Sequence, residues 1–331
     1  MKNRLLLFLL VFPYALLAQY NPDVLGNGFE SRVVEMPSDY DGKVVCTLIR
    51  KPLKDSCKRT ILYVHGYNDY FFQTEMANCL YDEGFNFYAV DLRKYGRSHL
   101  PNQSFFMVKE LKEYFADIDT CIAIIRREGA IDITLIGHST GGLITGLYAH
   151  ERRHALPFNR LIHNSPFYDF NESWFMENIA IPFVSFLGKY FPDLQISQGE
   201  STAYAESLLK QHHGEWSFDT NWKKPVNKYI PACWFRAIYL GHVTLQKGLL
   251  IPCPVLVLRS DKSVYGKVWT PDFQIGDAIL SVLDIAKYAK GVAITPPNQV
   301  VIPNGLHDLA LSNHTARTLF YENVLRFIKE N

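Results

Sequence analysis

Apolar residues recur along the chain in two alternating patterns, one typical of strands and one typical of helices. Short runs rich in apolar and β-branched residues predict buried strands, and apolar residues repeating every three or four positions predict amphipathic helices. The expected strands cover 30–36, 43–51, 60–64, 85–92, 131–136, 160–164, 254–258 and 299–302; the expected helices cover 111–125, 143–150, 277–290 and 315–328, with one more ending at Glu83. Such alternation predicts an α/β fold with a mostly parallel central sheet covered by helices on both faces.

The alternation stops at Ser165 and resumes after residue 250. No clear strand pattern occurs between them, and four of the five tryptophans lie in this stretch. We predict a largely helical cap over 165–250, inserted between two parts of one core, 19–164 and 251–331. The alternative is an ordinary continuation of the core with irregular loops.

The first 18 residues differ from the rest. Lys2 and Arg4 precede an apolar run from Leu5 to Leu17, and the small residue Ala18 follows. This order is typical of a secretory signal peptide over 1–18, and the run is short for the alternative, a membrane anchor. We therefore expect an exported protein, either periplasmic or secreted.

Composition narrows the class of protein. A formal charge of +1 over 331 residues, with no basic tract, gives no basis for binding nucleic acid. A hydrophobic content of 48% predicts a well-packed globule. The six cysteines form no C-x-x-C or metal-type pattern, so we expect no metal and no cofactor. In an exported protein Cys46 could pair with Cys57, or Cys233 with Cys253.

The segment 137–141 carries the strongest chemical indication. Its residues, Gly-His-Ser-Thr-Gly, fit the G-x-S-x-G nucleophile elbow, with an expected strand before it and an expected helix after it. A serine that attacks a carbonyl must project from a sharp turn, and flanking glycines lack the Cβ atoms that would clash there. The alternative is a glycine-rich turn that merely exposes a serine.

Three further motifs accompany the elbow in a fixed order. His65-Gly66-Tyr67 ends one expected strand, the stretch Asp-Leu-Arg-Lys-Tyr-Gly-Arg-Ser covers 91–98, and Gly-Leu-His-Asp covers 305–308. Together, from about residue 30 to the end, they resemble the monoglyceride-lipase-like, or serine-aminopeptidase-type, branch of the α/β hydrolases. Lys94 departs from the pattern, because that family has a glycine there.

The resemblance implies a catalytic role for several residues. Ser139 would be the nucleophile and His307 the base that removes its proton, because a serine hydroxyl is a weak nucleophile at neutral pH. The backbone N–H groups of Tyr67 and Thr140 would bind the oxyanion, so their side chains would be free to vary.

Two aspartates compete for the role of the acid that orients His307. Asp277 precedes His307 by 30 residues and Asp261 precedes it by 46. The shorter spacing fits the family, in which a loop, one helix and one strand separate the two residues, so we favour Asp277. Asp261 remains the alternative, because it lies nearer the end of its strand.

These residues predict an exported serine hydrolase with a Ser-Asp-His triad that cleaves carboxylic esters through an acyl-enzyme on Ser139. The expected substrate is a small-molecule ester with an apolar acyl group, such as a monoacylglycerol or lysophospholipid. Membrane contact is expected only through a lipid substrate. The alternatives are an aminopeptidase-type serine peptidase and a non-catalytic α/β hydrolase that binds a ligand.

An aromatic-rich segment begins the expected cap. In this architecture it would lie over the carboxyl ends of the strands, where ligands bind. The alternative is that its rings pack in the cap's own core. The six residues are Trp174, Phe175, Phe183, Phe186, Tyr190 and Phe191.

Overall fold

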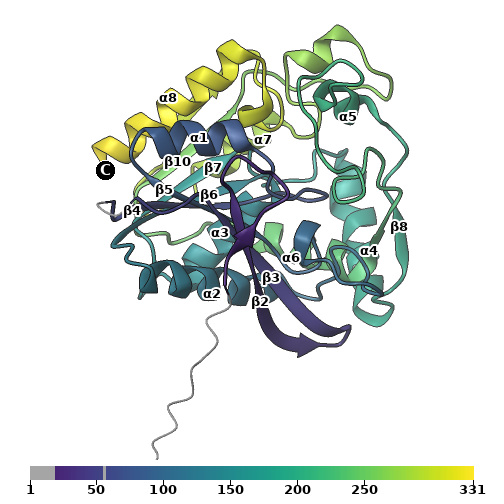
Figure 1. The fold of residues 1–331 in the computed structure, drawn as a ribbon. Helices are drawn as coiled ribbons and strands as arrows, with labels where there is room; N and C mark the ends of the chain where they lie inside the picture. The colour runs from purple at the N-terminus through teal and green to yellow at the C-terminus, as the bar shows by residue number, and fades with distance from the viewer. Residues whose placement is uncertain (1–18, 55–56) are drawn as a thin grey trace, which may run out of the picture.

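A nine-stranded sheet between two layers of helices forms the centre of the protein (Figure 1). The computed structural model describes residues 19–54 and 57–331, so the predicted signal peptide lies outside the described residues. The strand order is β1-β2-β3-β5-β4-β6-β7-β10-β11. Neighbouring strands from β5 to β11 are parallel, whereas β1, β2 and β3 add an antiparallel edge. The predicted mostly parallel sheet is confirmed.

The strands of this sheet closely match the stretches expected from the apolar pattern. Their bounds are β1 Asn21–Pro22, β2 Glu30–Asp39, β3 Gly42–Arg50, β4 Arg59–Val64, β5 Asn86–Asp91, β6 Asp132–His138, β7 Arg160–Asn164, β10 Val255–Ser260 and β11 Asn298–Ile302. All residues of β5 and all but the first of β6 are buried. Strands that are covered on both faces have this near-continuous apolar character.

Helices cover both faces of the sheet and create two apolar cores. Helices α1 and α8 pack on one face, and α2 and α3 pack on the other (Figure 1). The helices of the core are α1 Thr74–Asp82, α2 Glu113–Arg127, α3 Thr140–Glu151, α7 Val282–Ala289 and α8 His314–Glu330, with short turns η1 Gly96–Ser98, η3 Pro271–Gln274 and η4 Leu309–Leu311. None of the helices within 19–54 and 57–331 combines the length and apolar character that a membrane span needs.

The chain between β7 and β10 covers the residues for which a cap is predicted. Its helices are η2 Met176–Ala180, α4 Ile181–Tyr190, α5 Ala203–Leu208 and α6 Ala232–Gln246. Helix α6 packs against both α3 and α4, so it joins this segment to the core. The structure adds a two-stranded ribbon, β8 Gln195–Ser197 with β9 Tyr229–Pro231, that the sequence pattern did not indicate.

The predicted aromatic segment borders the cavity at Ser139, but its six aromatic rings neither line that cavity nor pack in a core of their own. All of them face solvent, with exposed fractions between 54% and 71%. The opposite side of η2 and α4 presents Met176, Ala180, Ile181 and Val184 to a cavity described below. Residues three or four apart share one face of a helix, which separates these four side chains from the exposed rings.

Helix α7 is shorter than the helix predicted over 277–290. It begins at Val282, after Ser281, whose hydroxyl accepts a hydrogen bond from the N–H of Asp284 as an N-cap. Asp277 lies before the helix in a turn of its own, where its Oδ1 accepts from the N–H groups of Ile279 and Leu280. The turn frees the Asp277 side chain from the helix surface.

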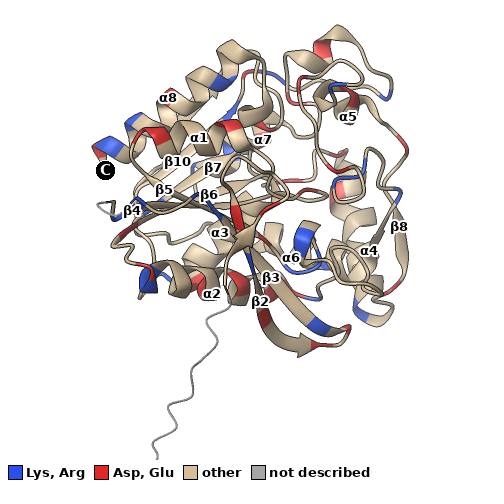
Figure 2. Ribbon diagram, viewed as in Figure 1, with Lys and Arg blue, Asp and Glu red and all other residues tan. Residues whose placement is uncertain are grey.

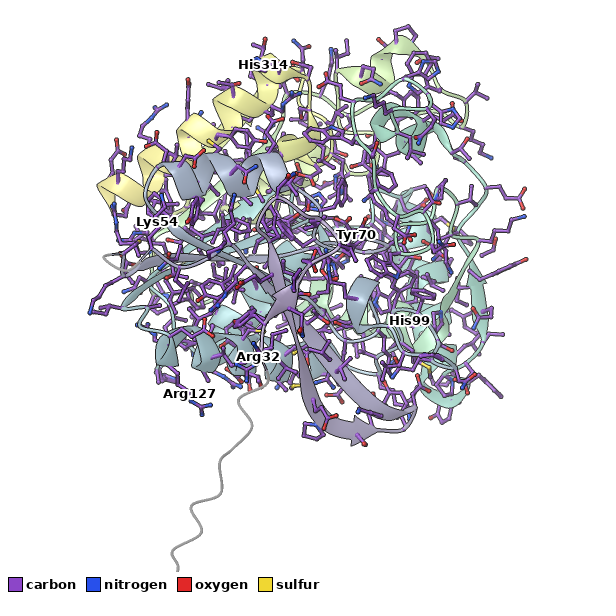
Figure 3. The ribbon with its side chains drawn as sticks, viewed as in Figure 1. Arg32, Lys54, Tyr70, His99, Arg127 and His314 are labelled. Atoms are coloured by element: carbon purple, nitrogen blue, oxygen red, sulfur yellow. The ribbon has the colours of Figure 1, made fainter. Side chains whose placement is uncertain are left out.

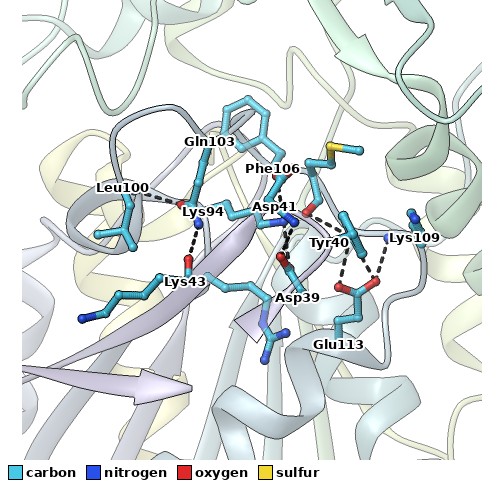
Figure 4. A network of polar contacts seen from close by, with 12 residues as sticks. Asp39, Tyr40, Asp41, Lys43, Lys94, Leu100, Gln103, Phe106, Lys109 and Glu113 are labelled. Atoms are coloured by element: carbon cyan, nitrogen blue, oxygen red, sulfur yellow. Dashed lines mark hydrogen bonds and ion pairs between the residues drawn. The ribbon is translucent and has the colours of Figure 1, made fainter. Parts of the chain in front are cut away.

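Lys94 stands where the related family has a glycine, and its surroundings show why a lysine is accepted. The backbone at Lys94 has φ +64°, a conformation that favours glycine. Its fully buried ammonium lies 2.9 Å from Asp39 Oδ2 and 3.0 Å from Asp41 Oδ2, both at the tip of the β2–β3 hairpin (Figure 4). The ion pairs therefore fasten the hairpin to the loop after β5.

We expect Lys94→Met to destabilise the protein by about 3–5 kcal/mol, because it leaves two partly buried carboxylates without their cation. Urea unfolding measures the change. Lys43→Met is the matched control on the same hairpin, since the Lys43–Glu35 pair is 62% and 76% exposed and such exposed pairs contribute little to stability. Equal losses in the two variants would contradict the assigned role of Lys94.

Candidate active site

Ser139 occupies the sharp turn between β6 and α3. Its backbone angles, φ 52° and ψ −119°, are rarely adopted by a residue with a side chain. The turn is tight enough to require its flanking glycines: a Cβ on Gly137 would lie 2.5 Å from the carbonyl oxygen of Gly141, and a Cβ on Gly141 would lie 2.5 Å from that of Val64. The strain aims the Ser139 side chain toward the loop after β11.

His307 lies in that loop and contacts both Ser139 and Asp277. Its Nε2 is 2.9 Å from Ser139 Oγ, and its Nδ1 is 3.0 Å from Asp277 Oδ2. All three side chains are buried, with exposed fractions of 7% or less. A hydroxyl, an imidazole and a carboxylate in this order have the geometry of a nucleophile, its base and the group that orients the base.

The two candidate acids occupy different environments. Asp277 is fully buried, and while Oδ2 faces His307, Oδ1 is held by two backbone N–H groups. Asp261 is exposed at the surface, where its Oδ1 accepts from the N–H of Asn304. Of the two carboxylates, Asp277 is the one in contact with His307.

The two proposed oxyanion donors lie beside Ser139. Thr140 is the first residue of α3, where backbone N–H groups have no partner within the helix. The N–H of Tyr67 donates to Thr140 Oγ1 at 2.7 Å. The expectation that both side chains are free to vary is therefore incomplete, because the Thr140 hydroxyl holds the Tyr67 amide in place and the phenol of Tyr67 is bonded to Asn227.

A buried charged cluster that the sequence did not indicate lies behind the elbow. His138 Nδ1 is 3.7 Å from Asp69 Oδ2 and 3.9 Å from Asp308 Oδ2. Burial alone lowers the pKa of a histidine, but the carboxylates of Asp308 and Asp69 raise the pKa of His138 above its ordinary value. The arrangement resembles a set of metal ligands, yet the Lys223 ammonium, 3.0 Å from Asp69 Oδ1, already supplies a cation.

Asp308 is tied to the core by amide side chains. Its Oδ2 accepts from Gln73 Nε2 at 3.0 Å, and its Oδ1 accepts from Asn164 Nδ2 at 2.8 Å. Asn164 Oδ1 in turn accepts from the N–H of Leu309, so the two residues that follow His307 are anchored to the end of β7. These bonds fix the position of the imidazole relative to Ser139.

Two cavities meet at Ser139. The first, of about 360 Å³, is mainly apolar and runs under η2 and α4. The second, of about 240 Å³, has lysine and asparagine side chains among its walls and lies between the loop after β4 and the segment 201–227. Both are bounded by Tyr67, Ser139 and Ile279. Among the other residues around the first cavity are Phe167, Phe170, Met176, Ile181, Val184, Ile230, Trp234 and Phe235.

The sheet topology, the elbow serine and the histidine loop after the last strand define the fold of an α/β hydrolase. The sequence profile of the family described as "Serine aminopeptidase, S33" matches residues 55–229, slightly more than half of the chain. The chain therefore belongs to this family, which confirms the resemblance inferred from the four motifs. A comparison with curated proteins finds no match.

Solved structures share the fold over most of their length. A soluble variant of monoglyceride lipase from Saccharomyces cerevisiae, in complex with a substrate analogue, is 15% identical with a TM-score of 0.64 and covers 91% of this chain and 96% of its own. Monoacylglycerol lipase from Paleococcus ferrophilus is 15% identical with a TM-score of 0.62 and covers 91% and 100%. Est1E from Butyrivibrio proteoclasticus is 16% identical with a TM-score of 0.54 and covers 90% and 98%. This chain thus has the fold of known lipases and esterases.

Proposed function

We propose that the protein is a serine hydrolase that cleaves carboxylic esters through an acyl-enzyme on Ser139. The observation that carries the proposal is the continuous contact from Asp277 through His307 to Ser139 at the mouth of an apolar cavity. Covalent labelling of Ser139 with a fluorophosphonate tests it directly.

Each residue of the proposed triad has a defined step. His307 Nε2 takes the proton of Ser139 Oγ as the oxygen attacks the ester carbonyl, and Asp277 stabilises the imidazolium that forms. The backbone N–H groups of Tyr67 and Thr140 donate to the oxyanion, for which the amide of Tyr67 must exchange the Thr140 hydroxyl for the substrate oxygen. His307 then returns the proton to the leaving alcohol, and water hydrolyses the acyl-enzyme by the same route.

The apolar cavity supports an acyl chain as the part of the substrate that it holds. Its walls are aromatic and aliphatic, and it opens on Ser139. Burying a methylene group there contributes roughly 0.8 kcal/mol. Monoacylglycerols and lysophospholipids fit this chemistry, and a monoglyceride lipase and a monoacylglycerol lipase are among the proteins that share the fold.

We expect kcat/KM for p-nitrophenyl esters to rise with acyl length beyond acetate, by roughly threefold or fourfold per methylene while the chain remains within the cavity. Val184→Trp should shorten the optimum, because Val184 contacts the cavity. Phe183→Trp, one residue away and 60% exposed, should leave the optimum unchanged. Values of kcat/KM that stay flat or fall with acyl length would contradict a lipid-like substrate and favour a small ester or a peptide.

An aminopeptidase would need carboxylates that hold the substrate amine. Four glutamates of the segment 165–250, Glu172, Glu177, Glu206 and Glu215, form no cluster beside Ser139. Glu172 alone borders the apolar cavity, and Glu215 is paired with Arg317 at 2.8 Å. The ester substrate is therefore favoured over the peptide. The remaining alternative is a non-catalytic α/β hydrolase that binds a ligand, which covalent labelling of Ser139 would exclude.

Export is the second part of the proposal, supported by the charged start, the apolar run and Ala18. We expect the mature protein to begin near Gln19 and to lie outside the cytoplasm. N-terminal sequencing of the protein purified from its native cells measures this. A chain that begins at Met1 or Lys2 would contradict the proposed signal peptide.

A further inference from the structure

The second cavity beside Ser139 is bordered by basic but not by acidic side chains among the described residues. Two lysines, Lys223 and Lys224, border it, and no aspartate or glutamate among the described residues does. Ser139 and His307 also border this cavity. An alcohol group that lies in it is therefore in position to accept the proton from His307 and leave. If the apolar cavity holds the acyl chain, this second cavity receives the leaving alcohol.

The two lysines are not equivalent. Lys223 is 8% exposed, and its ammonium is already neutralised by Asp69 at 3.0 Å. Lys224 is half-buried and has no carboxylate within 4.0 Å among the described residues. Its ammonium instead lies 4.2 Å from the ring of Phe105, which stacks on His99 (labelled in Figure 3). Because no carboxylate among the described residues neutralises it, this ammonium can pair with an anionic ligand.

The backbone of Lys224 is held firmly next to the proposed oxyanion donor. Asn68 Nδ2 donates to the carbonyl oxygen of Lys224 at 2.7 Å, and Asn68 Oδ1 accepts from its N–H at 3.0 Å. Asn68 follows Tyr67 directly, so these bonds hold the Lys224 backbone beside the loop that carries Tyr67. The ammonium ends a flexible four-carbon stem and can turn from Phe105 toward the cavity without moving this backbone.

We propose that this enzyme prefers esters whose leaving alcohol carries a negative charge, a phosphate or a carboxylate, and that Lys224 is the residue that binds it. The inference rests on the proposed ester hydrolysis. An anion in the second cavity would give the Lys224 ammonium, once turned from Phe105, the opposite charge that it lacks among the described residues. A substrate with an ammonium in the same place would meet Lys224 and be disfavoured.

The test compares three decanoyl esters below their critical micelle concentrations. They are 1-decanoylglycerol, 1-decanoylglycerol 3-phosphate and the decanoyl ester of glyceric acid. We expect kcat/KM for a charged ester to exceed that for the neutral one by about tenfold to a hundredfold, the effect of a charge-assisted hydrogen bond. The two charged esters distinguish phosphate from carboxylate. Raising the salt concentration should reduce the preference.

Variants assign the preference to one residue. Lys224→Met should bring the ratio of charged to neutral ester close to one, and Lys224→Arg should retain it. Lys228→Met is the matched control, because Lys228 is 56% exposed and paired with Glu200 at 2.7 Å. The ratio is insensitive to a general loss of folded enzyme. No preference in the wild type, or a preference that survives Lys224→Met, would overturn the proposal while ester hydrolysis stands.

A binding measurement is independent of turnover. Calorimetry with the Ser139→Ala protein should give a lower Kd for 1-decanoylglycerol 3-phosphate than for 1-decanoylglycerol, and the additional Lys224→Met substitution should remove the difference. Equal Kd values would overturn the proposal. Absent hydrolysis of all three esters, with the difference in Kd intact, would instead overturn the proposed function and leave an anion-binding site.

Discussion

Replacing Ser139 with alanine should reduce the hydrolysis of p-nitrophenyl esters by on the order of a millionfold, the usual loss of a triad nucleophile. Ser139 Oγ lies 2.9 Å from His307 Nε2, so the substitution removes the oxygen that attacks the ester. Alanine removes one buried oxygen and keeps the backbone of the elbow. The steady-state rate with purified protein gives kcat/KM directly.

The control for this substitution is Ser165→Ala. Ser165 is fully buried just after β7, and its hydroxyl has no hydrogen-bond partner among the described residues. The variant should keep most of its activity, and both variants should unfold at urea concentrations close to the wild-type value. Full activity in Ser139→Ala would contradict the role of the elbow.

Replacing Asp277 with asparagine should reduce kcat by about ten-thousandfold. The Asp277 carboxylate faces His307 Nδ1 at 3.0 Å and selects the tautomer in which Nε2 accepts the serine proton. An amide in this place can donate to Nδ1 and stabilise the wrong tautomer. KM should change little, because Asp277 does not border either cavity at Ser139.

Asp261→Asn is the matched control for this variant. Asp261 is exposed, and its Oδ1 accepts from the backbone of Asn304. The substitution should change kcat by less than about tenfold, as expected for a surface hydrogen bond. A larger loss in Asp261→Asn than in Asp277→Asn would assign the acid to Asp261.

The fold and the position of Ser139 could be predicted because both depend on local sequence. The strand β7 begins and ends at the predicted residues, and the elbow lies between a buried strand and a helix as expected. The start of α7 could not be predicted, because Ile279 fits the apolar spacing of the helix. In the structure Ile279 and Leu280 instead form a turn with Asp277 before the helix begins.

The charged cluster behind Ser139 could not be predicted, because its members come together only in the folded chain. Asp69 follows β4, Lys223 lies between α5 and β9, and Asp308 follows β11. No local spacing connects them. Figure 2 likewise shows charged residues of both signs spread over the elements, so composition alone does not indicate where a buried group forms.

The exposed rings show a different limit. Apolar spacing distinguishes one helix face from another, but on η2 and α4 both faces carry large apolar residues. The sequence therefore could not tell which face lines the cavity. The cysteines are a similar case: all six are free, and Cys46 contacts Cys121 rather than Cys57.

Covalent labelling with a fluorophosphonate tests the central claim most directly. The reagent reacts with a serine activated by its own base, without any assumption about the substrate. We predict one adduct per chain by intact mass, located on the peptide that contains Ser139, and none in Ser139→Ala. A folded protein that takes up no label, or that is labelled at another residue, would contradict the account.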